Sequence, residues 1–167
     1  ESPFGSRIAT IHNGSSLFSG RAGSGESNIR RWVFENDWVE AIVGLPLNLF
    51  YNTGIATYVW VLTNKKPEER KGKVQLIDAR DWYSDMRKNL GMKNRELTTD
   101  QVDRIQNTFE SFEEDEHSKI FDNEDFGYWS VTVERPLRLR YALEVSEEAL
   151  KEAEAENKLK GFVDKAQ

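Results

Sequence analysis

The sequence predicts an α/β protein whose sheet is covered on both faces, and three observations support this fold class. Segments rich in β-branched and aromatic residues recur along the chain, as strands require. One of them, residues 55–63, is apolar at both alternating sets of positions, so we expect a central strand inside the sheet. Between the strands, apolar residues recur at helical spacing. The 167 residues contain no cysteine and fit one ordinary domain without disulfides.

The first half of the chain alternates between strands and helices. Residues 7–12 predict a short strand. Ile29, Trp32 and Val33 then lie at i, i+3 and i+4, which predicts the apolar stripe of a helix that ends near Asn36. Two more strands follow, over residues 39–46 and 55–63, and a charged turn leads to a fourth strand over residues 74–79.

The second half predicts more helix than strand. We expect a weak helix over residues 81–89. Thr98 and Gln101 have the spacing of a capping box and begin the most clearly predicted helix. Its apolar positions recur at helical spacing and are Val102, Ile105, Phe109 and Phe112. The last predicted elements are a bent strand pair around Pro136 (residues 128–133 and 137–143) and a helix from Ser146 to about Gly161.

Charge is distributed unevenly along the chain. The net charge of −6 argues against a free-standing nucleic-acid binder, since such domains usually carry a basic surface. Residues 1–95 hold 14 Lys/Arg against 10 Asp/Glu, a net charge of +4, whereas residues 96–167 hold 9 against 19, a net charge of −10. The acidic half is typical of a solvated helical surface.

No local motif nominates a catalytic or metal-binding residue. The two histidines, His12 and His117, stand alone, so we expect no metal site. The glycines at 20, 23 and 25 match neither common phosphate-binding spacing, which favours a flexible loop before the helix. There is no G-x-S-x-G segment that would indicate a hydrolase.

Longer segments resemble one family. The segments "RIATIHNGSSLFSG", "GSGESNIRRWVFENDWVEAIVGLPLNLFYNTGIATYVWVLTNKK" and "GKVQLIDA" resemble the methylation subunit of type I restriction-modification systems, an adenine-N6 DNA methyltransferase that uses S-adenosylmethionine. The later "SKIFDNEDFGYWSVTVERPLRL" is also similar to that family. The resemblance covers nearly the whole chain and is weakest after Tyr141.

The resemblance implies a more specific fold. We expect the C-terminal part of a doubly wound, Rossmann-like sheet of an S-adenosylmethionine-dependent methyltransferase, followed by a helical and β extension. Residues 39–45 and 56–63 would form its antiparallel hairpin. Residues 1–95 would belong to the methyltransferase domain, and residues 96–167 would be an acidic extension of the same domain.

The family's catalytic motif is not in this chain. Its members carry a glycine-rich cofactor loop and an Asn-Pro-Pro-aromatic motif, whereas the prolines here stand at 3, 46, 67 and 136, none of them adjacent. We therefore expect no catalytic residue in this chain, no methylation by the chain alone, and S-adenosylmethionine bound only in the full-length protein, by residues that remain unknown. The alternative is a non-catalytic remnant or assembly module that contacts the specificity and restriction subunits.

The resemblance also implies a binding site for a flipped base. A methyltransferase acting on adenine in a duplex must extrude the base, which then needs a flat surface to rest on. Phe50 is the first candidate for that surface and Tyr51 the second, although both rings are also compatible with simple packing under the loop. Arg21, Lys65 and Lys66 are the candidates for DNA phosphate contacts.

The family's partners are DNA, a specificity subunit and a restriction subunit. We also expect the chain to self-associate through an exposed sheet edge. No apolar segment is long enough to cross a membrane and the first residues do not resemble a signal peptide, so we expect a soluble, cytoplasmic protein with no membrane partner.

Overall fold

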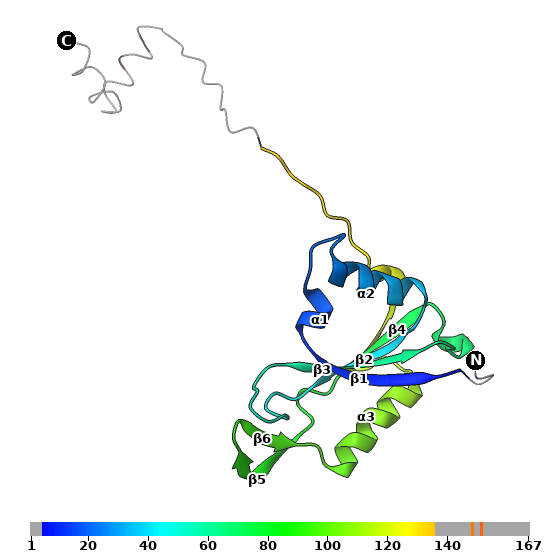
Figure 1. The fold of residues 1–167 in the computed structure, drawn as a ribbon, viewed down its shortest axis with the longest axis vertical. Helices are drawn as coiled ribbons and strands as arrows, with labels where there is room; N and C mark the ends of the chain where they lie inside the picture. Colours follow the sequence, from blue (N-terminus) through cyan, green and yellow to red (C-terminus); the bar gives the residue numbers. More distant parts are fainter. Residues whose placement is uncertain (1–4, 136–147, 149–150, 152–167) are drawn as a thin grey trace. The chain divides into compact units, whose positions relative to one another are not determined.

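The computed structural model describes residues 5–135 together with Glu148 and Lys151. The chain forms two compact units, Glu1–Ser130 and Val131–Gln167. The first contains a five-stranded sheet of order β1-β3-β2-β4-β7 and a two-stranded sheet of β5 and β6 (Figure 1). Its elements are β1 (Arg7–Asn13), α1 (Ser15–Phe18), α2 (Gly25–Glu35), β2 (Val39–Leu45), β3 (Thr57–Thr63), η1 (Glu68–Arg70), β4 (Lys73–Asp78), β5 (Ser84–Leu90), β6 (Lys93–Glu96), α3 (Thr99–Ser111), β7 (Ser118–Asp122) and η2 (Asn123–Phe126).

Strand β2 is the innermost element. All of its residues are buried, and it pairs antiparallel with β3 on one side and parallel with β4 on the other. Helices α1 and α2 lie on one face of the sheet and α3 on the other (Figure 1). The α/β class, the sheet covered on both faces and the antiparallel pairing of β2 with β3 are therefore confirmed.

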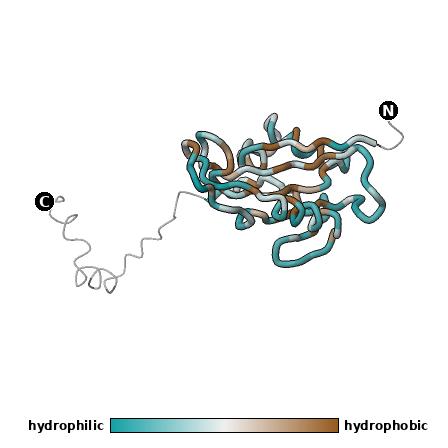
Figure 2. Tube along the Cα trace, turned by 90° about the horizontal axis from the view of Figure 1, so that it is seen from below, coloured by the Kyte–Doolittle hydropathy of each residue, from teal (hydrophilic) through white to brown (hydrophobic). Residues whose placement is uncertain are grey.

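Alternation along the strands divides the core into two clusters. The cluster under α2, which we call the α2 core, consists of Phe34, Val39, Ile42, Trp60 and Val74. The cluster under α3, which we call the α3 core, consists of Val43, Leu45, Ile77, Ala79 and Trp82. Figure 2 shows hydrophobic segments along the inner strands and hydrophilic segments in the outer loops.

A buried polar network fastens α3 to the sheet. The carboxylate of Glu40 is 1% exposed and accepts hydrogen bonds from Arg7 at 2.8 and 3.1 Å. The guanidinium of Arg70 donates to the side chain of Gln75 at 3.2 Å and to the backbone carbonyl of Phe109. Buried polar groups need partners within the protein: Glu40 finds one on β1, and Arg70 finds one on the backbone of α3.

Residues 81–89 were predicted to form a weak helix, but most of them belong to strand β5, which forms a hairpin with β6. Strand β5 pairs antiparallel with β6, with Leu90 opposite Lys93. Gly91 between them has a φ of +64°, a conformation that glycine adopts without steric cost at the first central position of a two-residue hairpin turn. The polar residues of β5 show no apolar period, so the turn chemistry was the only signal for this hairpin.

Two expected burial patterns are wrong. In α2, Ile29 and Trp32 are 66% and 53% exposed, and Phe34 is the residue that enters the core. Strand β3 lies inside the sheet as expected, between β1 and β2, but it is less deeply buried than predicted, since four of its seven residues are only half-buried. The fully covered strand is β2.

The predicted strand at residues 128–133 is absent, and these residues form neither strand nor helix. Its expected partner, residues 137–143, lies outside the described residues, as does most of the predicted helix after Ser146, of which Glu148 and Lys151 are helical. Elements α1 and β7 were not predicted. The functional boundary at residue 95 stays a prediction, although α3 and β7, which follow it, belong to the first unit.

Strand β1 is an edge of the larger sheet. It pairs only with β3, and its Ile8 and Ile11 are 60% and 51% exposed. In the part of the chain that the structure describes, no helix is long and apolar enough to span a bilayer.

Candidate nucleic-acid interface

The aromatic loop, residues 46–56, joins β2 to β3 and contains both aromatic candidates. It begins at the buried Pro46 and turns twice through left-handed residues, Asn48 at φ +59° and Asn52 at φ +54°. Asparagine tolerates this conformation better than most side chains, which explains its use at both turns. The carbonyl of Asn48 accepts hydrogen bonds from the backbone N–H groups of Asn94 and Arg95 at 3.2 and 3.4 Å. The loop is thereby fixed to β6.

The two aromatic candidates face different surroundings. Phe50 is half-buried and packs against the α3 core together with Leu49. Tyr51 is 63% exposed, and the Nζ of Lys93 lies 5.3 Å from its ring centroid. The structure therefore holds Phe50 rigidly from one side and presents the ring of Tyr51 to solvent. The assignment of either ring to a flipped base stays a prediction.

The candidate phosphate ligands do not gather around this loop. The aromatic loop precedes β3, whereas Lys65 and Lys66 follow it, so they lie at opposite ends of that strand. The side chain of Lys66 is 1% exposed; its ammonium pairs with Asp37 at 2.5 Å and donates to the carbonyl of Lys73 at 2.6 Å. These contacts argue against a phosphate contact by Lys66, although its assignment stays a prediction. Arg21 and Lys65 are exposed.

The hairpin of β5 and β6 brings other cations to the aromatic loop. Lys93 lies over Tyr51, and the guanidinium carbon of Arg95 lies 3.8 Å from the ring centroid of Tyr83. Arg87 and Lys88 are exposed on β5. These four residues were missed because the segment was expected to be helical. The signal that could have found them is the Gly-Met turn flanked by basic residues.

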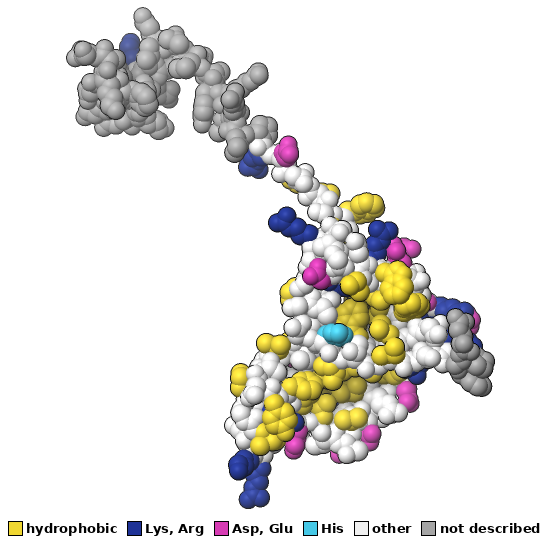
Figure 3. Space-filling model, in the orientation of Figure 1, with side chains coloured by type: hydrophobic (Ala, Val, Ile, Leu, Met, Phe, Trp, Pro, Cys, Tyr) yellow, Lys and Arg dark blue, Asp and Glu magenta, His cyan; other side chains and the backbone are white. Residues whose placement is uncertain are grey.

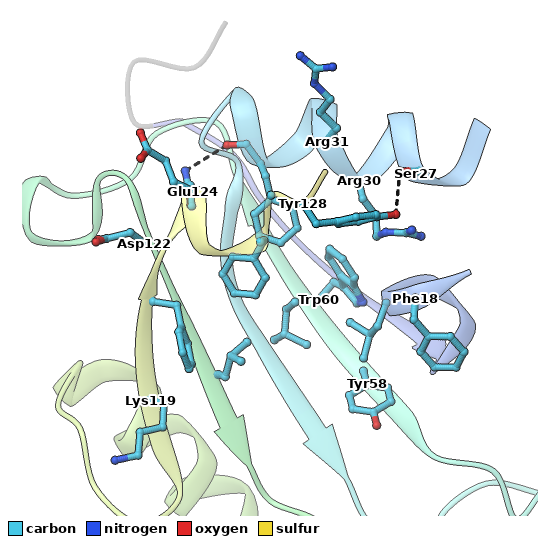
Figure 4. Close-up of a pocket in the computed structure, with 18 of the residues that line it drawn as sticks. Phe18, Ser27, Arg30, Arg31, Tyr58, Trp60, Lys119, Asp122, Glu124 and Tyr128 are labelled. Carbon is cyan, nitrogen blue, oxygen red and sulfur yellow. Dashed lines mark hydrogen bonds between the residues drawn. The ribbon is translucent and has the colours of Figure 1, made fainter. Parts of the chain in front are cut away.

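A broad groove opens on the α2 side of the sheet. Its volume is about 1980 Å³, and Figure 4 shows Tyr58 and Trp60 on its floor, with Phe18 and Tyr128 beside them. Figure 3 shows hydrophobic side chains gathered around a histidine on one side of the molecule. The indole N–H of Trp60 donates to the hydroxyl of Ser16 at 3.2 Å.

The polar end of the groove is neutralised by an internal ion pair. Arg80 donates two side-chain hydrogen bonds to Asp78, at 2.7 and 2.6 Å. These bonds lower the pKa of Asp78, and the same pairing raises the pKa of Arg80. A carboxylate with a lowered pKa that is held by a guanidinium is a poor general acid at neutral pH. The Asp78–Arg80 pair is therefore not a general acid–base pair.

The glycine-rich turn before α2 does not fit a cofactor phosphate or an S-adenosylmethionine molecule. It follows α1 rather than a strand, and a Cβ placed at Gly20 would lie 2.3 Å from the Oγ of Ser24. The turn is thus closed by its own side chains. Among the described residues there is also no group of three or more His, Cys, Asp or Glu side chains that could hold a metal ion.

Comparisons with known proteins agree on one family. The family model described as N-6 DNA Methylase matches residues 3–157. The MjaIX methylase subunit of a type I restriction enzyme from Methanocaldococcus jannaschii is 36% identical over 95 residues, which are 57% of this chain and 16% of that protein. The MjaVII methylase subunit from the same organism is 33% identical over 120 residues, 71% of this chain and 20% of that protein.

A solved structure is similar in both sequence and fold. It is the type I restriction-modification system methyltransferase subunit from Streptococcus thermophilus, with 28% identity and a TM-score of 0.58. The similarity covers 71% of this chain and 23% of that one. The chain therefore spans about a fifth of the length of the proteins that it matches.

Proposed function

This chain belongs to the N-6 DNA methylase family, and from that membership we propose that it is part of a type I restriction-modification methylase subunit. The complete subunit transfers a methyl group from S-adenosylmethionine to the N6 atom of adenine in DNA. The observation that carries this proposal is the family match over residues 3–157. We assign the cofactor and the catalytic residues to the complete subunit, outside the described residues of this chain.

The contribution of this chain to the reaction is a surface for the extruded adenine. The aromatic loop supports this role because its first turn is fixed to β6 through the carbonyl of Asn48 and because it carries two neighbouring rings. Phe50 is the platform, since packing on the α3 core holds its ring still, and Tyr51 is the second ring. A preorganised flat surface lowers the entropic cost of holding the base and adds stacking energy of about 1–3 kcal/mol.

The partners follow from the same proposal. The complete subunit acts on DNA in the cytoplasm, together with a specificity subunit and a restriction subunit.

A second candidate function is a non-catalytic assembly module. The exposed apolar side chains of Ile29 and Trp32 favour it, because they are neighbours at i and i+3 on α2 and a contiguous exposed apolar surface marks an interaction site. A methylation assay of the complete subunit separates the two candidates, since a subunit that serves only in assembly leaves no methyl group on DNA when it is the sole methylase subunit present.

The test uses the complete subunit assembled with its specificity subunit. Mass spectrometry of digested DNA measures N6-methyladenine, and 2-aminopurine at the target position measures base extrusion. Phe50→Ala lowers methylation by a factor equivalent to about 1–3 kcal/mol, and Phe50→Trp retains most of the activity.

Leu49→Ala is the matched control. Leu49 packs on the same α3 core from the same loop but offers no flat ring. Both alanine variants lower the melting temperature, whereas only Phe50→Ala lowers methylation in the protein that stays folded. Equal losses of methylation in the two variants would show that Phe50 is only a packing residue.

A further inference from the structure

The hairpin of β5 and β6 concentrates positive charge at one end of the first unit. Between Arg87 and Arg95 it carries four basic residues and no acidic one: Arg87, Lys88, Lys93 and Arg95. Figure 3 shows Lys and Arg side chains projecting at the lower end of the molecule, where Figure 1 draws β5 and β6. This charge is notable in a chain whose net charge is −6.

These cations are not neutralised within the structure. Elsewhere the basic side chains of Arg31, Lys71 and Lys73 pair with carboxylates. Over residues 5–135, Glu148 and Lys151, by contrast, none of the four hairpin cations forms an ion pair with a carboxylate. Lys93 and Arg95 instead lie over aromatic rings, which orient a cation without cancelling its charge.

The hairpin is held firmly against the aromatic loop. Two hydrogen bonds to the carbonyl of Asn48 join the two segments. They also approach closely at two glycines: a Cβ atom added at Gly54 would lie 3.3 Å from the Cε of Met92, and one added at Gly91 would lie 3.1 Å from the Oδ1 of Asn52. The turn of the hairpin and the aromatic loop are therefore in close contact, and a ligand that reaches one also meets the other.

We propose that the β5–β6 hairpin binds the phosphate backbone of DNA beside the base held by the aromatic loop, with Arg87 and Lys88 as its main phosphate ligands. Both side chains are exposed and lie where β5 departs from regular pairing with β6, between Asp85 and Leu90. The described carboxylates leave their charge unpaired, and the phosphate backbone of DNA supplies a row of negative charges that matches it. The location beside the base rests on the proposed function, whereas the phosphate contacts do not.

The experiment measures DNA affinity as a function of salt. The complete subunit is titrated onto a fluorescein-labelled DNA duplex, and fluorescence anisotropy gives the dissociation constant at several salt concentrations. The double variant Arg87→Gln with Lys88→Gln lowers the slope of log affinity against log salt by about 0.9 for each phosphate that is no longer neutralised, and so by about 1.8 in total. The charge-retaining variant Arg87→Lys with Lys88→Arg keeps the wild-type slope.

The matched control is Lys71→Gln with Lys73→Gln. It removes the same net charge from two exposed lysines that pair with carboxylates. Its slope stays at the wild-type value, because these cations are already neutralised. An equal change in both glutamine pairs would assign the effect to net charge alone and overturn the proposal.

Two further outcomes overturn the proposal. One is a wild-type slope in the Arg87/Lys88 glutamine variant. The other is an unchanged slope with loss of the specificity subunit on purification, which would make the hairpin a protein-binding element. If the double variant does not fold, each single glutamine variant lowers the slope by about 0.9 instead.

The binding assay does not depend on methyl transfer. A subunit with a hairpin-dependent salt slope but no methylation would refute the proposed function and leave the hairpin assignment intact. Normal methylation with a wild-type slope in the glutamine variant would refute the hairpin assignment alone.

Discussion

Substitution of Lys66 tests most directly whether a cation stabilises the fold or binds DNA. Lys66→Met removes the ion pair with Asp37 and the hydrogen bond to the carbonyl of Lys73. Removing one partner of a fully buried pair costs about 3–5 kcal/mol. Asp37 is 32% exposed and keeps hydrogen bonds from Gly72 and Asn123, so water and these donors offset part of that loss. We expect a loss of about 2–3 kcal/mol in the free energy of unfolding.

Thermal unfolding followed by circular dichroism measures this loss. For a chain of this size each kcal/mol corresponds to about 3–4 °C, so Lys66→Met lowers the melting temperature by about 6–12 °C. Lys73→Met is the control, because its side chain is 46% exposed and its carboxylate partner Asp122 lies 3.7 Å away. Such a surface pair contributes less than about 1 kcal/mol. An unchanged melting temperature for Lys66→Met, combined with a lower salt slope of DNA binding in the complete subunit, would refute the reasoning and restore Lys66 as a phosphate ligand.

Three further expectations can be checked on the same chain. Burial raises the pKa of Asp37, but hydrogen bonds chiefly from Lys66 outweigh it and hold the pKa below its ordinary value of 3.8; the resulting stabilisation is present above about pH 4 and is lost as the pH falls through the folded-state pKa. Acid titration of Asp37→Asn should accordingly show a shallower loss of stability than wild type below pH 4. Thr98→Ala removes the capping box with Gln101 and lowers stability by about 1 kcal/mol in urea unfolding, whereas Thr98→Ser changes it little. The edge strand β1 makes the isolated chain self-associate with rising concentration, and light scattering that reports only monomer would contradict this.

The elements predicted correctly have local signals of their own. The strands β2, β3 and β4 contain β-branched runs, and α3 begins at a capping box that forms as expected between Thr98 and Gln101. The burial of individual side chains has no such local signal, because it depends on which face of a helix or strand packs against another element. Phe34 rather than Trp32 enters the core, although both belong to the same helix.

In the candidate site, too, the sequence reveals local features but not tertiary contacts. The loop with Phe50 and Tyr51 could be identified from its aromatic residues and turn chemistry. Lys66, in contrast, stands in a charged segment that resembles an exposed turn. Its burial arises because Asp37, 29 positions away, and the segment around Asn123 fold onto it. The basic hairpin was missed because its strands are polar and carry no apolar alternation. Its place beside the aromatic loop depends on a tertiary contact, which the sequence does not reveal.

The pairing of β1 has a consequence for the order of folding. Ser6, next to β1, hydrogen-bonds to Asn64, which is 58 positions away in the sequence. During synthesis β1 is therefore made well before its partner β3. The aromatic loop that joins β2 to β3 is much shorter than the segment between β1 and β3, so the entropy of closing the β2–β3 contact is smaller and these two strands pair first. Strand β1 is thus added to a sheet that β2 and β3 have already begun.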